Sequence, residues 1–84
     1  MKIAQYVSWQ RIADRVYIID ENSNSIIRIE DVAADIWVLL SKNLNRKEIV
    51  KRICCRYQVE EQVVKDDVDN FANDMIRRGL ILVK

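Results

Sequence analysis

The chain has 84 residues, of which 50% are hydrophobic and 32% charged, a composition typical of one folded domain rather than of a disordered segment. Its 14 basic and 13 acidic residues give a net charge of +1, which argues against a dedicated nucleic-acid binder. The absence of histidine, and a single glycine at position 79, exclude a histidine-based catalytic pair and a glycine-rich phosphate loop. We therefore expect one non-enzymatic domain over residues 1–84, without metal or cofactor.

The expected compartment is the cytoplasm. The amino terminus lacks an apolar signal core, and the longest apolar run, residues 36–40, is far too short to span a membrane. Cys54 and Cys55 are adjacent on a predicted helix and have no histidine partner, so a zinc site is not expected. We expect one buried and one surface thiol in a reducing compartment.

The first thirty residues predict strands. Residues 3–9 alternate with a period of two and form one mostly apolar face, which indicates a half-buried strand. Residues 16–19, a β-branched and aromatic run, and residues 26–29, which are mostly isoleucine, are separated by the polar cluster 20–25, which is typical of a turn. We expect the last two strands to form an antiparallel hairpin.

After position 31 the apolar period changes to 3.6, and three helices follow. The first has an apolar stripe within residues 32–40, and Asn45 with Glu48 matches the capping pattern that opens the second. The third and longest is expected over about residues 60–78, followed by Gly79 as a left-handed residue and a short apolar tail. The order predicts an α+β, winged helix-turn-helix-like fold with a three-stranded antiparallel sheet followed by three helices.

The two later helices carry opposite charge. Residues 42–56 contain six basic side chains against one acidic, whereas residues 60–76 contain six acidic side chains against one basic. An acidic third helix would be repelled by phosphates, so DNA binding through it is not expected. A winged helix that binds DNA through its basic second helix is the alternative, and that helix could also dock on an acidic partner protein or simply be a solvated face.

The segment VYIIDENSNSIIRIEDVAADIWVLL, residues 16–40, resembles the PqqD-like recognition domains of ribosomal peptide biosynthesis. Those domains have a strand, an acidic polar turn, a second strand and a capped helix. Two positions depart from the family pattern: Glu30 replaces the usual capping Asn, and Glu60 stands where Asp-Pro is frequent. The resemblance covers roughly residues 15–82. The matching positions of the first helix and its approach are Ile29, Val32, Ala33, Ala34, Ile36, Trp37, Leu39 and Leu40.

The resemblance implies a domain that binds the leader segment of a precursor peptide and presents it to a separate leader protease or other maturation enzyme. A chain that ends with this domain is expected to act in trans, as in lasso-peptide systems; a quinone-cofactor pathway stays open. A structural adaptor whose edge strand pairs with a fixed protein partner is a further alternative. Neither nucleic acid nor membrane is an expected partner.

The leader is expected to add as an antiparallel strand to the edge formed by residues 26–29, which has no proline and one charge. A proline at Ile27 is expected to remove one of the outer donors of that edge. The third helix is expected to flank the groove with apolar side chains and with two carboxylates that meet basic leader residues. The predicted peptide-binding residues are Ile26, Ile27, Arg28, Ile29, Val64, Asp67, Val68, Phe71, Asp74 and Met75.

Overall fold

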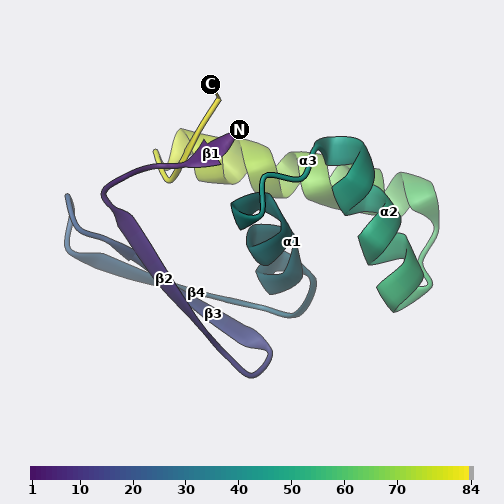
Figure 1. Ribbon diagram of the computed structural model, residues 1–84, viewed down its shortest axis with the longest axis horizontal. Helices are drawn as coiled ribbons and strands as arrows, with labels where there is room; N and C mark the ends of the chain where they lie inside the picture. The colour runs from purple at the N-terminus through teal and green to yellow at the C-terminus, as the bar shows by residue number, and fades with distance from the viewer. Residues whose placement is uncertain (84) are drawn as a thin grey trace.

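The computed structural model describes residues 1–83 and has the predicted α+β, winged helix-turn-helix-like arrangement (Figure 1). A three-stranded antiparallel sheet has the order β2-β3-β4, and α1 lies between this sheet and α2 (Figure 1). A second, two-stranded sheet pairs β1 with β5 and brings the two ends of the chain together. The elements are β1 (Lys2–Ile3), β2 (Val7–Ile12), β3 (Arg15–Asp20), β4 (Ser25–Glu30), α1 (Asp31–Ser41), α2 (Arg46–Tyr57), α3 (Glu61–Arg77) and β5 (Ile81–Leu82).

The prediction of one continuous first strand over residues 3–9 is wrong. The chain turns after Ile3, where the amide of Val7 donates to the carbonyl of Ala4 at 3.1 Å. β1 pairs with β5, whereas β2 pairs with β3. A period of two reports which face of a strand is apolar but not which strand lies beside it, so the sequence pattern could not reveal the break.

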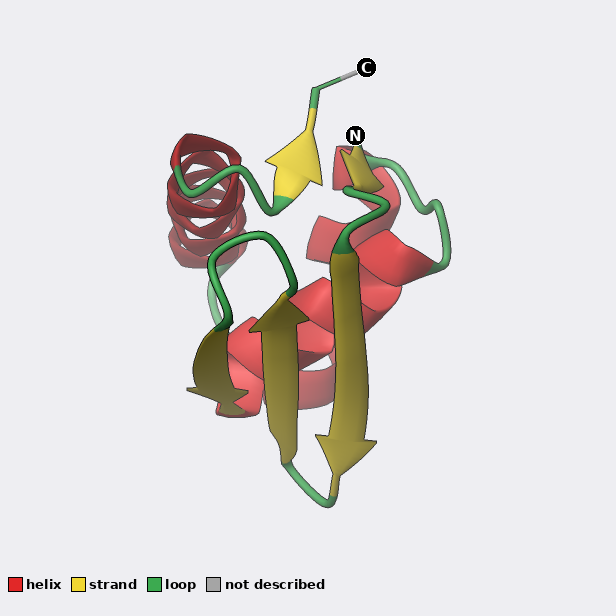
Figure 2. Ribbon diagram, turned by 90° about the vertical axis from the view of Figure 1, so that its left-hand side faces the viewer, coloured by secondary structure: helices red, strands yellow, loops and turns green. Residues whose placement is uncertain are grey.

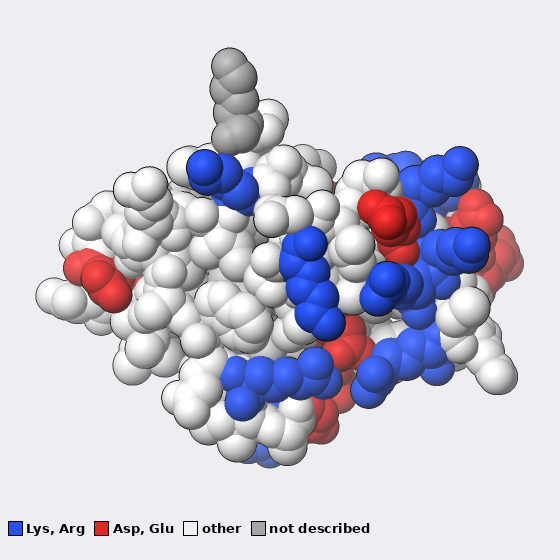
Figure 3. All heavy atoms as spheres, in the orientation of Figure 1, with Lys and Arg blue, Asp and Glu red and all other residues white. Residues whose placement is uncertain are grey.

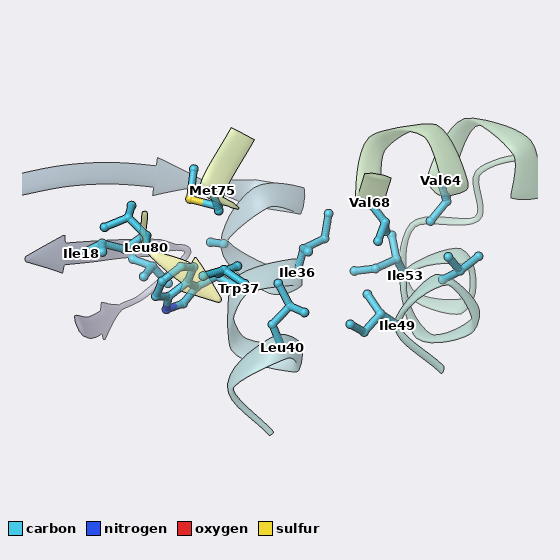
Figure 4. Packing of buried hydrophobic residues seen from close by; sticks show 14 residues of the cluster. Ile18, Ile36, Trp37, Leu40, Ile49, Ile53, Val64, Val68, Met75 and Leu80 are labelled. Atoms are coloured by element: carbon cyan, nitrogen blue, oxygen red, sulfur yellow. The ribbon is translucent and has the colours of Figure 1, made fainter. Parts of the chain in front are cut away.

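The core lies where α1 covers the inner face of the sheet (Figure 4). Val16 and Ile18 of β3 are fully buried, and so is Trp37 of α1. The rings of Trp9 and Trp37 meet edge to face, with centroids 6.4 Å apart. The inner surface of the sheet is therefore covered by the molecule itself, and its outer surface is left to solvent.

The predicted helix ends are largely confirmed. Asn45 accepts from the amide of Glu48 at 2.9 Å and donates its own amide to the Glu48 carboxylate at 3.2 Å, which is the reciprocal capping box. Gly79 has φ of 77°, as a left-handed residue after a helix should. Glu30 makes no side-chain capping bond to α1. Cys55 is exposed as expected, but Cys54 is only half-buried because it lies at the border of the apolar stripe of α2.

One buried carboxylate joins three elements. Asp35 of α1 is only 7% exposed. Its oxygens accept from Arg11 of β2 at 3.2 Å, from Arg56 of α2 at 3.1 Å, and from the hydroxyl of Tyr57. Burial and the bond to Asp35 raise the pKa of Tyr57 above its usual value. The second helix is thereby fixed to both the sheet and the first helix.

A second polar contact joins α2 to α3. The guanidinium of Arg46 donates to both oxygens of Asp69, at 2.6 and 2.9 Å. This bidentate bond holds the pKa of Asp69 below its usual range. Both side chains are about half exposed, so solvent screens much of the attraction. It joins the first residue of α2 to the middle of α3.

Among residues 1–83, no helix is long and apolar enough to cross a membrane.

We predict that Asp35→Ala lowers the free energy of unfolding by about 2–3 kcal/mol, because several charge-assisted hydrogen bonds are lost at a buried site. Asp67→Ala is the matched control, since Asp67 is exposed and makes no ion pair among the described residues; it should change stability by less than about 0.5 kcal/mol. Urea denaturation measures both. Equal stability of the two variants would show that the Asp35 contacts contribute nothing net.

Candidate functional site

The strand β4 has one bonded neighbour in the part of the chain that the structure describes. Its residues pair with β3 in the register Ile18↔Ile27 and Tyr17↔Arg28, as the predicted hairpin requires. The opposite edge of β4 faces no other strand of the sheet. In Figure 2 the three strands lie side by side, and α3, seen nearly end-on, lies on the side of β4 and away from β2.

Two hydrogen bonds reveal which backbone groups of β4 point outward. The amide of Asp31 donates to the carbonyl of Asp14 at 3.2 Å, just beyond the pair Arg15↔Glu30. In an antiparallel ladder this bond marks Arg15↔Glu30 as a pair that exchanges no hydrogen bonds, and such pairs alternate with bonded ones. Ile27 and Ile29 therefore bond to β3.

The amides and carbonyls of Ile26 and Arg28 consequently point away from the sheet. The pairing of β3 with β2 gives the same alternation. The amide of Glu21 donates to the carbonyl of Tyr6 just beyond the pair Val7↔Asp20, so Val16 and Ile18 of β3 direct their backbone groups toward β4. The expectation that a proline at Ile27 removes an outer donor is therefore wrong, since that amide belongs to the β3–β4 ladder. The outward donors include the amides of Ile26 and Arg28.

The side chains of β4 divide between the two faces of the sheet. Ile27 and Ile29 are half-buried and pack against the core. Ile26 lies on the outer face, is 69% exposed and is paired in register with Ile19, which is also exposed. Arg28 is on the outer face as well, with Glu30 at 3.2 Å. The outward backbone groups of β4 thus lie between apolar side chains on both faces of the sheet: Ile27 and Ile29 on the inner face and Ile26 on the outer face.

Three of the predicted groove residues belong to the core instead. Val64, Val68 and Met75 are 2%, 1% and 3% exposed. Figure 4 shows Val64 and Val68 directed toward Ile53 and Ile49 of α2. The prediction that these three side chains line an open groove is corrected: they form the central stripe by which α3 is attached to the rest of the domain.

The remaining predicted residues of α3 lie together at one border of that stripe. At about 100° per residue, Asp67, Phe71 and Asp74 fall on the side of α3 opposite to Asp69, which faces α2. Phe71 is half-buried and packs on the core, and Asp67 is exposed. This border is a part of α3 that lies outside its buried stripe.

The two carboxylates at this border differ in their surroundings. Asp74 is paired with Arg77 at 3.8 Å and with Arg78 at 3.2 Å. Asp67 has no ion pair within residues 1–83. A basic ligand would therefore meet an uncommitted charge at Asp67 and a largely neutralised one at Asp74.

The structure also reveals polar features that the sequence reasoning missed. Asp35 interrupts the apolar stripe of α1, and that position was the available signal for a buried carboxylate. Two hollows, of about 520 and 380 Å³, lie against α2. A groove between β4 and α3 stays a prediction.

In the part of the chain that the structure describes, the three-stranded sheet ends in two edge strands, β2 and β4, and an open strand edge can accept an added peptide strand. The chain belongs to the PqqD family, described as coenzyme PQQ synthesis protein D, whose model matches residues 15–81. This confirms the resemblance found in the sequence. Among curated proteins no match is found.

Two solved structures are similar along nearly their whole length. One is TbiB1 in complex with the TbiA(β) leader peptide, with 27% identity, a TM-score of 0.94, and 100% of this chain and 98% of that chain covered. The other is lasso peptide synthetase B1 complexed with the leader peptide, with 18% identity, a TM-score of 0.87 and coverage of 95% and 94%. The second likeness establishes the fold alone.

We predict that Ile27→Pro destabilises the protein more than Arg28→Pro does, by at least about 1 kcal/mol, because only the first removes a ladder bond. Thermal or urea unfolding of the two variants measures the difference. A larger loss of stability in Arg28→Pro would show that the amide of Arg28, and not that of Ile27, bonds to β3.

Proposed function

We propose that this protein binds the leader segment of a ribosomally made precursor peptide and presents it to a separate maturation enzyme, without itself catalysing a reaction. The observation that carries the proposal is the open edge of β4 in a PqqD-family domain. The likeness to TbiB1, whose structure contains a leader peptide, supports it. The partner enzyme is proposed to be a leader protease of a lasso-peptide system, acting in the cytoplasm where the precursor is made.

The proposed binding mode is addition of the leader as a strand antiparallel to β4. The backbone groups of Ile26 and Arg28 would bond to the leader, each bond contributing about 0.5–1.5 kcal/mol net. Leader side chains that alternate inward would contact Ile27, Ile29 and Phe71, where two apolar side chains could each contribute about 1.5–3 kcal/mol. After the cost of ordering the leader, this amounts to micromolar to submicromolar affinity.

Backbone pairing does not distinguish one leader from another, so selectivity must come from side chains. The apolar side chains of Ile27, Ile29 and Phe71 select hydrophobic residues at alternate leader positions. Asp67 selects a basic residue near the part of the leader that passes α3. Val64, Val68 and Met75 act indirectly, because they hold α3 in place rather than contact the leader.

DNA binding, the alternative drawn from the winged-helix outline, has no support from the comparisons. The alternative of a fixed adaptor shares the open edge but differs in its partner. A precursor gene with a protease gene beside this one would favour the leader-binding role, and a leader from such a neighbourhood is the probe for the two experiments below.

We predict that Arg28→Pro weakens leader binding by about tenfold, whereas Arg28→Ala, which keeps the amide, changes it by less than about threefold. Titration calorimetry measures both. In the wild-type protein, hydrogen exchange should slow at the amides of Ile26 and Arg28 when the leader binds, while Ile27 and Ile29 are already protected. If Ile26 and Arg28 keep their exchange rates in the complex, the leader does not add as a strand to β4.

We predict that Asp67→Lys weakens binding of a basic leader by about tenfold at low salt and by less at high salt, because the lost attraction is screened. Asp66→Lys is the matched control, with the same change of charge about 100° around the helix. Calorimetry at two salt concentrations compares them. Equal losses for the two variants would show that only the overall charge of α3 matters.

A further inference from the structure

The exposed face of α2 is basic, and although Arg46 and Arg56 are paired with carboxylates, other cations on or beside this helix are not paired within residues 1–83. Four cations on α2 or in the loop before it form no ion pair with any carboxylate in residues 1–83. On α3, by contrast, Glu61, Asp69 and Asp74 are all paired. Figure 3 shows the blue side chains gathered over the half of the molecule that contains α2. The uncommitted cations are Lys42, Lys47, Lys51 and Arg52.

This basic surface is hollowed on both sides of α2. On the side of α3 lies a hollow of about 520 Å³. Its lining includes Lys47, Lys51, the ion pair of Lys65 with Glu61, and the apolar side chains of Val50 and Cys54. On the side of α1, a second hollow of about 380 Å³ follows. It is bordered by Lys42 and Arg52, and its floor includes Val38, Leu39 and Ile53. Cys55 borders both hollows.

Cations around apolar floors suit a ligand that combines acidic and apolar side chains. We propose that the exposed face of α2 docks an acidic, amphipathic segment of a partner protein, with carboxylates on Lys47, Lys51 and Arg52 and apolar side chains in the hollows. A protein segment supplies both kinds of contact, which a duplex does not. The net charge of +1 and the carboxylate of Glu61, which lines the first hollow, also disfavour a polyanion.

The surface is separate from the edge of β4. α1 lies between the sheet and α2 (Figure 1), and β4 lies with α3 on the other side of the sheet from β2 (Figure 2). Arg11 of β2 lines the second hollow, so that hollow opens toward the β2 side. The inference extends the proposed function, since a partner bound at α2 would leave β4 free for a leader, but the docking itself does not depend on strand addition.

The test uses a labelled synthetic helical peptide of about 20 residues with glutamates on one face and leucines on the other, in fluorescence anisotropy at low salt. Lys47→Glu/Lys51→Glu should weaken its binding by about tenfold or more. The matched control, Lys2→Glu/Arg77→Glu, makes the same change of charge on exposed side chains away from α2 and should alter binding by less than about twofold. Circular dichroism confirms that both variants are folded.

Two further probes separate the classes of ligand. A peptide with the same glutamates but serines in place of leucines should bind about fivefold or more weakly, because the apolar floors are then unused. A random duplex of about 20 base pairs should bind more weakly than the amphipathic peptide. Tighter binding of the duplex would overturn the proposal in favour of a nucleic-acid surface, and equal effects of the two double variants would overturn it as well.

The strand-addition variant keeps the two proposals apart. Arg28→Pro should leave binding of the acidic peptide unchanged, because position 28 lies on the edge of β4. If Arg28→Pro abolishes that binding, the peptide occupies the β4 edge and the α2 surface is not its site. If a leader fails to bind the wild-type protein but the acidic peptide binds at α2, the proposed function fails and this inference stands.

Discussion

The alternation of hydrogen bonds along β4 decides which of its backbone groups are free to bond to another polypeptide. β4 runs into α1 without a loop, so its inner side chains are covered by the helix while its outer edge is left open. Because bonded and non-bonded pairs alternate, Ile27 and Ile29 hold the strand on β3, and Ile26 and Arg28 present their backbone groups outward. β4 is thus held in the sheet by β3 and still has backbone groups free to bond to an added strand.

The rest of the fold keeps that edge in a defined position. Asp35 ties α1 to β2 and α2, and the bidentate contact of Arg46 with Asp69 ties α2 to α3. The apolar stripe of α3 contributes Val64 and Val68 to the same core. An edge held by a rigid frame loses less entropy on binding than a mobile strand would, which favours a peptide that must itself become ordered.

The opposite charges of α2 and α3 have different fates in the tertiary structure. Several carboxylates of α3 are neutralised by Arg46, Lys65 and Arg78, so the acidic helix is less available to ligands than its composition indicates. Lys47, Lys51 and Arg52 of α2, by contrast, form no ion pair within residues 1–83. A basic surface beside apolar hollows is therefore a stronger indication of a partner than the charge count of either helix.

The sequence by itself determined that strands come before three helices, and it determined the β3–β4 hairpin, the capping box at Asn45 and the left-handed Gly79, because each depends on residues close together in the chain. It also determined the family, through a pattern spread over residues 15–81. Only the tertiary structure decided that the first strand divides between two sheets and that Val64, Val68 and Met75 are core rather than groove. It also decided that the Arg28 amide, not that of Ile27, faces outward. Those outcomes depend on which segments pair across the fold, and neither apolar periodicity nor helix propensity carries that information.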